Sequence, residues 1–296
     1  MLQIQLVLIC LMLSLGLTAC QSAGQPQTQQ TPAQPKRIVS LAGSITEVLY
    51  AAGLDDQLVG VDVTSTYPAA AAALPKVGHN RNIQAEGILA LAPDLVIGRA
   101  NELKPAVEAQ LRQAGVELIL LPQVYSVAGT KRLIRQVCDT LGQAGVAKEL
   151  SQTIDADLGR VQPLAAPPRA MFIYARGAGT LMVAGEGTQM QQMLELAGAT
   201  NAVQGFADFK PLTPEALVEA NPEVIVLFDR GLSSLEGPEG LLAVPGVAQT
   251  IAGQQRAFIT MDGQLLAGFG PRVGQAAAKL NAELRRLTQT QPLAEG

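Results

Sequence analysis

The chain lacks most of the side chains on which metal and nucleophile chemistry depends. It has 296 residues but only one histidine, His79, no tryptophan, and aromatic side chains at 3%. The sequence contains no G-x-S-x-G elbow, no Cys–His pair and no H-E-x-x-H pattern, so the usual hydrolase and metalloprotease arrangements are excluded. Sites for zinc or manganese usually need several histidines. We therefore expect a protein that is not an enzyme.

A charge excess of either sign is also missing. The formal net charge is −4, which gives no reason to expect a nucleic acid partner. Hydrophobic residues make up 48% and charged residues 16%, so the chain has enough apolar material for one large core or two ordinary ones.

The N-terminal segment is typical of an exported protein. Residues 6–17 form an apolar run of 12, which is too short for a permanent membrane span and suits a secretory signal over residues 1–19. The following "LTAC" resembles the lipobox of bacterial lipoproteins, which implies lipidation of Cys20 and a membrane anchor; an unlipidated secretory signal is the alternative. Residues 20–36, rich in Gln and Pro, predict a disordered tether. Cys138 then remains as a lone thiol, which we expect to be buried.

The rest of the chain alternates between short apolar runs and amphipathic segments. This pattern predicts an N-terminal α/β lobe over 37–144, an inter-lobe helix over 145–162 and a C-terminal α/β lobe over 163–296. Each lobe would have a central, mostly parallel sheet, because continuous apolar runs such as "PDLVIG" and "PEVIVLF" are typical of parallel strands covered on both faces. One long helix would join the lobes, with a ligand cleft between them.

An internal echo supports this division. "EGILALAPDLVI" begins at Glu86 and "EALVEANPEVIV" begins at Glu215, 129 positions later, and in both a proline falls seven residues after the glutamate. We expect the two glutamates to occupy equivalent places on the two lobes.

Several motifs together resemble one family. The stretches "RIVSLAGSITEVLYAAG", "LVGVDVTSTYP", "MVAGEGT" and "LLAGFGPRVGQAA" are similar to the haem-binding proteins of bacterial haem ABC importers. These belong to the periplasmic binding proteins with a rigid inter-lobe helix, a class that also serves cobalamin and ferric siderophores. "TSTYP" and "GFGPR" fit the haem branch best. The resemblance covers about 37–287.

The resemblance implies that Tyr67, in "TSTYP", is the axial ligand of haem iron. Ferric iron is a hard cation and a phenolate is a hard oxygen donor, but a free phenol ionises only near pH ~10, so iron and nearby cations would have to favour the anion. The alternative is that Tyr67 packs at the end of a strand with Pro68 starting a turn.

Some members of the family place a second iron ligand, a histidine, where this chain has Arg176. A guanidinium cannot donate to iron, so the departure suggests one haem, and Arg176 would stabilise a phenolate or bind a propionate. It is otherwise an exposed loop arginine. His79 would ligate iron, line the cleft or lie in an exposed loop, and the polar stretch "GHNRN" favours the exposed loop. Further candidate haem contacts, each open to ordinary packing instead, are Arg81, Tyr174, Met182, Phe206 and Lys210.

The resemblance also implies that Glu86 and Glu215 dock into arginine pockets of the permease, one on each lobe. The alternative is that each carboxylate only stabilises the N-terminus of its helix. Together these features predict a lipid-anchored monomer in the periplasm or at the outer face of the cytoplasmic membrane. It would bind haem and deliver it to an ABC permease dimer with its ATPase; the alternative cargo is cobalamin or a ferric siderophore.

Overall fold

The computed structural model describes residues 36–79, 82–179 and 181–289. Signal, lipidation and tether predictions, including Cys20, lie outside these ranges. Among the described helices, none is both long and apolar enough to cross a membrane.

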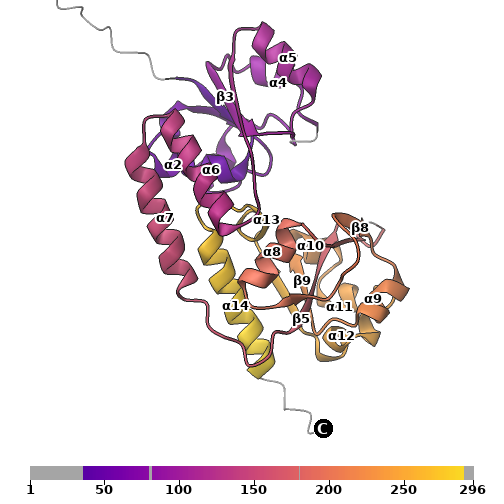
Figure 1. The fold of residues 1–296 in the computed structure, drawn as a ribbon. Helices are drawn as coiled ribbons and strands as arrows, with labels where there is room; N and C mark the ends of the chain where they lie inside the picture. Colours follow the sequence, from indigo (N-terminus) through magenta and orange to yellow (C-terminus); the bar gives the residue numbers. More distant parts are fainter. Residues whose placement is uncertain (1–35, 80–81, 180, 290–296) are drawn as a thin grey trace, which may run out of the picture. The chain divides into compact units, whose positions relative to one another are not determined.

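The first sheet forms the centre of the N-terminal lobe (Figure 1). All its neighbouring strands are parallel, in the order β2-β1-β3-β4. Its strands are β1 (Ile38–Ser40), β2 (Leu58–Val61), β3 (Leu95–Arg99) and β4 (Glu117–Leu121). The central strands β1 and β3 are rich in Val and Ile and are buried on both faces, as expected for parallel strands covered by helices.

Helices connect these strands, as parallel pairing requires. They are α2 (Gly43–Ala51), α3 (Ala69–Ala73), α4 (Ala85–Leu89) and α5 (Pro105–Gln113), with a 3-10 turn η1 (Asp55–Gln57) before β2; a further helix, α6 (Val127–Thr140), follows β4. Helix α5 has proline at its first position, where the missing N–H costs nothing. Helix α6 begins at Ser126, whose side chain accepts a hydrogen bond from the Gly129 N–H.

The second sheet is mixed. Its path is β10-β9-β5-β6-β8, with β7 paired to β5. Its strands are β5 (Arg169–Ala175), β6 (Leu181–Ala184), β7 (Thr200–Asn201), β8 (Phe209–Pro211), β9 (Val224–Phe228) and β10 (Phe258–Met261). Strand β6 runs antiparallel to β5 because only residues 176–180 connect them, too few for a crossover, and β8 pairs antiparallel with β6.

Helices of the C-terminal lobe surround this sheet (Figure 1). They are α8 (Gln189–Leu196), α9 (Pro214–Ala220), α10 (Asp229–Ser234), α11 (Pro238–Leu242), α12 (Ile251–Gln255), α13 (Gly263–Ala267) and α14 (Val273–Gln289), with a 3-10 turn η3 (Val247–Gln249).

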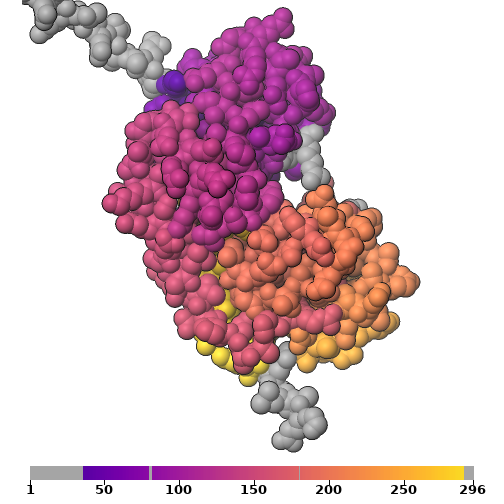
Figure 2. All heavy atoms as spheres, in the orientation of Figure 1, coloured from indigo at the N-terminus to yellow at the C-terminus, as the bar shows by residue number. Residues whose placement is uncertain are grey.

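Helix α7 (Ala144–Leu158) leads from the first lobe to the second and packs against α6 and α14. Its buried residues are Ala147 and Ile154, and it ends at Gly159, inside the segment expected to be helical. Much of its surface is open to solvent (Figure 2). The predicted fold class, two α/β lobes joined by a helix, is confirmed.

Cys138 lies on the buried face of α6 and forms no disulfide. Its side chain is 1% exposed, and burial raises the pKa of its thiol to about 11.

Candidate functional site

Tyr67 lies in the loop that follows β2, directly before α3, and its peptide bond to Pro68 is cis. Its side chain is 46% exposed, which is unusual for a large apolar ring in this molecule. The structure shows no hydrogen bond from the phenol oxygen to another residue of the described ranges. The hydroxyl is therefore available to an external partner.

The residues before Tyr67 are held by buried polar contacts. Asp62 is 1% exposed; its carboxylate accepts hydrogen bonds from the Thr64 N–H at 3.0 Å, from the Thr64 hydroxyl and from the Ser65 hydroxyl at 2.5 Å. The Ser65 and Thr46 hydroxyls lie 2.8 Å apart, which ties the loop to α2. The Lys76 ammonium donates to the Ser65 carbonyl at 2.9 Å, and burial lowers the pKa of Lys76. These contacts hold the backbone of the loop that presents Tyr67.

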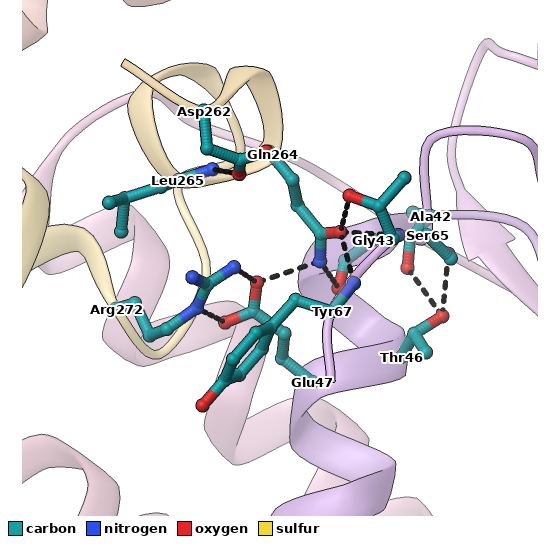
Figure 3. A network of polar contacts seen from close by, with 11 residues as sticks. Ala42, Gly43, Thr46, Glu47, Ser65, Tyr67, Asp262, Gln264, Leu265 and Arg272 are labelled. Carbon is teal, nitrogen blue, oxygen red and sulfur yellow. Dashed lines mark hydrogen bonds and ion pairs between the residues drawn. The ribbon is translucent and has the colours of Figure 1, made fainter. Parts of the chain in front are cut away.

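A guanidinium lies over the Tyr67 ring. The Arg272 Cζ atom is 3.6 Å from the ring centroid, a cation–π contact. Arg272 also forms a bidentate ion pair with Glu47 of α2, with Nε–Oε2 at 2.9 Å and Nη2–Oε1 at 2.6 Å. Figure 3 shows Glu47, Arg272 and Gln264 converging beside Tyr67. Glu47 is 217 residues from Gln264 and 225 from Arg272 in the sequence, so the site is a product of the tertiary fold.

Glu47 is 6% exposed, and burial raises its pKa above the ordinary value of 4.5 although Arg272 and the Gln264 side chain both act to lower it. The ion pair with Glu47 holds the Arg272 guanidinium over the phenol ring of Tyr67. The geometry places a fixed positive charge beside a half-exposed phenol.

Several candidates in the C-terminal lobe lie together on β5, β6 and β8. Tyr174 and Met182 are cross-strand partners, and Tyr174 makes an edge contact with the Phe228 ring, the centroids 6.1 Å apart. The Lys210 ammonium lies 4.5 Å from the centroid of the Phe206 ring. Because Lys210 pairs with Val183, Lys210 and Phe206 lie on one face of this antiparallel part, and Tyr174 and Met182 lie on the other.

The remaining candidates are more dispersed. Arg176 is exposed in the turn after β5, and no direct contact joins it to Tyr67 in the described structure. His79 is exposed, and its carbonyl accepts a hydrogen bond from the Asn82 N–H at 2.7 Å. Arg81 lies outside the described residues.

Glu86 and Glu215 are exposed, and each lies in the first turn of its helix, α4 or α9. Helix α9 begins at Thr213, whose hydroxyl accepts from the Ala216 N–H. A shallow recess beside Glu86 is lined by Ala85, Leu89, Gln110, Gln113 and Ala114.

Three residues of this site were not among the candidates from sequence: Glu47, Gln264 and Arg272. A signal existed for two of them. Glu47 is a carboxylate between Ile45 and Val48 on a helix face that the apolar spacing marks as buried, and Arg272 ends the "GFGPR" stretch. Gln264 has no comparable signal.

Comparison with known proteins places the chain in a class. Residues 38–265 match the family model described as "Periplasmic binding protein". The apo structure of the periplasmic heme-binding protein RhuT from Roseiflexus sp. RS-1 is similar at 39% identity and a TM-score of 0.82, covering 86% of this chain and 99% of that one. The periplasmic heme-binding protein BhuT in complex with two hemes is similar at 37% identity and a TM-score of 0.81, covering 85% and 98%.

Curated relatives include proteins of other kinds within this class. The uncharacterized ABC transporter substrate-binding lipoprotein YvrC of Bacillus subtilis is 28% identical over 83% of this chain and 79% of its own length. The vitamin B12-binding protein of Vibrio campbellii is 31% identical over 69% and 74%. The resemblance noted in the sequence is thereby confirmed, and the chain belongs to the periplasmic binding protein family.

Proposed function

We propose that this protein binds haem outside the cytoplasm, with the phenolate of Tyr67 on ferric iron, and delivers it to an ABC permease. The observation that carries the proposal is the Tyr67 side chain itself: 46% exposed, its hydroxyl without a partner in the described structure, and its ring 3.6 Å from the Arg272 guanidinium. A hard oxygen donor beside a fixed cation suits ferric iron in a macrocycle that carries carboxylates.

The similarity to RhuT and BhuT, both heme-binding, supports this cargo. The second lobe offers Tyr174 and Met182 on one face of its sheet for contact with a porphyrin, and Arg176 in the turn after β5 for a propionate; Phe206 and Lys210 are candidates on the other face. His79 and Arg81, from the first lobe, are further candidates for contact with the haem. We infer one haem, because the chain has Arg176 where some members of the family have a second ligand.

Delivery would use Glu86 and Glu215, one exposed carboxylate on each lobe. The N-terminal signal would export the protein, and a lipid on Cys20 would attach it to the outer face of a membrane. Opposite charges across such an interface set the register of docking.

The second candidate cargo is a corrinoid or a ferric siderophore. The relationship to the vitamin B12-binding protein of Vibrio campbellii favours the corrinoid.

Titrating one sample of the purified protein with haemin and another with cobalamin distinguishes these cargoes. With haemin we expect saturable binding at one equivalent and the absorption spectrum of tyrosinate-ligated ferric haem. In Tyr67→Phe that spectrum should be lost and affinity should fall at least about tenfold, since an iron–oxygen bond has been removed. Tyr50→Phe, which removes a phenol near the end of α2 and keeps Tyr67, is the control for the spectrum. Saturable binding of cobalamin with none of haemin would contradict the proposal.

A further inference from the structure

The backbone just before the phenol ring depends on one distant side chain. The Oε1 atom of Gln264 accepts hydrogen bonds from the Thr66 N–H at 2.6 Å, from the Tyr67 N–H at 2.8 Å and from the Thr66 hydroxyl at 3.0 Å. Two consecutive main-chain donors thus share one acceptor that lies about 200 positions away in the sequence. Backbone N–H groups in this setting would otherwise be left without a protein partner.

The other end of the same amide is equally committed. The Nε2 atom of Gln264 donates to the Gly43 carbonyl at 3.2 Å and to the Glu47 Oε1 atom at 2.7 Å. Gln264 is 9% exposed. A primary amide has two donor hydrogens and one carbonyl oxygen, and all are used here. Turning the amide by 180° would face N–H against N–H, so its orientation is fixed.

The segment that carries Gln264 is itself anchored. It lies in α13, directly after β10 of the second sheet, and the Asp262 carboxylate at the start of α13 accepts from the Leu265 N–H at 2.9 Å. On the other side, Gly43 leaves room for the amide: a Cβ atom there would lie 2.9 Å from Cδ and from Nε2 of Gln264. The contact therefore needs glycine at 43 and glutamine at 264 together.

Glu47 links this amide to the cation above the ring. Its Oε1 atom accepts from Gln264 and from Arg272, while Arg272 covers the Tyr67 ring and Gln264 holds the Tyr67 N–H (Figure 3). Main chain and ring of the same residue are thus located by two side chains that share one carboxylate. We propose that Gln264 is the positioning residue of the iron ligand: it sets where the Tyr67 phenol is presented to the metal.

This inference rests on the proposed function, since it concerns the presentation of Tyr67 to haem iron. It predicts that Tyr67 alone is not sufficient for tight binding. A variant with an intact phenol but no Gln264 amide should bind haemin weakly, and a merely structural residue would not produce that separation.

The test compares Gln264→Met, which keeps the length and removes every hydrogen bond, with Gly43→Ala, which displaces the amide without changing it. Gln254→Met, at an exposed position of α12, is the matched control. Two measurements are made on the full chain. Hydrogen exchange of the Thr66 and Tyr67 amides needs no ligand. Haemin dissociation and the tyrosinate spectrum report on the metal, and thermal unfolding shows that each variant is folded.

In Gln264→Met we expect exchange of those two amides and dissociation of haemin each to be about tenfold faster, since two hydrogen bonds to the loop are lost. The tyrosinate spectrum should weaken in both test variants and stay unchanged in the control. If haemin binds the wild type through Tyr67 and the variants show unchanged exchange and dissociation, this inference alone is overturned. If the wild type does not bind haemin, the proposed function fails first and the role of Gln264 toward iron fails with it.

Discussion

Glu47 and Arg272 form a buried ion pair whose two members respond differently to burial. The guanidinium is always protonated, and both of its bonds to Glu47 are short. The carboxyl is 5% exposed at its side chain and has a raised pKa because burial outweighs the pairing. Removing the cation leaves the carboxylate with one strong partner fewer in a buried site.

Arg272→Met should therefore destabilise the fold by about 3 kcal/mol at pH 8, because an unpaired buried charge remains. The loss should depend on pH. In this variant the pKa of Glu47 in the folded state is raised further above its ordinary value of 4.5, so the free energy of unfolding is highest below that value and decreases as pH rises through the folded-state pKa. Urea unfolding at several pH values measures both effects.

The double variant Glu47→Gln/Arg272→Met is the control, since it removes the charge and keeps an acceptor for Gln264. It should recover most of the stability and lose the pH dependence. An equal pH dependence in the single and double variants would contradict this account.

At the level of elements, helices α7 and α14 pack closely against each other. A Cβ atom on Gly274 of α14 would lie 2.6 Å from the Ile154 carbonyl oxygen and 2.8 Å from the Asp157 Cβ atom, both in α7. The first of these is a backbone atom, which cannot move aside alone. Glycine at 274 therefore sets how closely the two helices pack.

Gly274→Ala should destabilise the fold by about 1–3 kcal/mol through overpacking, even though alanine favours a helix over glycine by about 0.5–1 kcal/mol. Gly145→Ala is the matched control. It lies in α7 with no atom within 4 Å of the added methyl, and we expect neutral or slightly higher stability. Denaturant midpoints measure both, and equal midpoints for the two variants would refute the packing argument.

At the level of the whole molecule, the two lobes repeat one arrangement. Before β1, the Arg37 N–H donates to the Asp94 carboxylate at 2.8 Å and its guanidinium donates to the Leu91 carbonyl at 2.8 Å. At the start of β5, the Arg169 N–H donates to the Glu223 carboxylate at 2.7 Å, and the Arg169 guanidinium donates to the Ala220 carbonyl at 2.5 Å.

These acceptors fall at the same offsets from Glu86 and from Glu215, eight residues for the carboxylate and five for the carbonyl. In both lobes a residue with positive φ, Ala92 or Asn221, precedes the proline. The expectation that the two glutamates occupy equivalent places is consistent with this repeat.

If Glu86 and Glu215 dock as proposed, reversing both charges in Glu86→Lys with Glu215→Lys should reduce haem-dependent growth of cells at least about tenfold, because the lysines would repel the arginines expected on the permease. Haemin binding by the purified protein should not change. Glu219→Lys, exposed on the same helix as Glu215, should leave uptake intact. Normal uptake by the double variant would rule out docking through these residues.

Much of the fold could be predicted because its central strands have continuous apolar sequences. The run 224–228, for example, is buried along its length and was expected as a strand. Strands β6 and β8 were missed: β6 has four residues and β8 ends in a proline, so neither shows a clear strand pattern. The pairing of β6 with β5 is decided by the short connection between them and not by local preference, and β8 then pairs with β6.

The candidate site was only partly predictable. Tyr67 stood out through its motif, but Gln264 lies 197 residues from Tyr67 and Arg272 lies 225 residues from Glu47. Contacts at such separation form because the segment after β10, which carries Gln264 and Arg272, lies against the first lobe. No local periodicity in the sequence encodes them.

The deep position of Cys138 has a consequence for chemistry in the cell envelope. Oxidants and alkylating agents react with the thiolate, and with a pKa of about 11 only about one molecule in a thousand carries that form at pH 8. By keeping the Cys138 thiol protonated and buried, the folded body resists alkylation and disulfide formation at this position in reducing and oxidising surroundings alike.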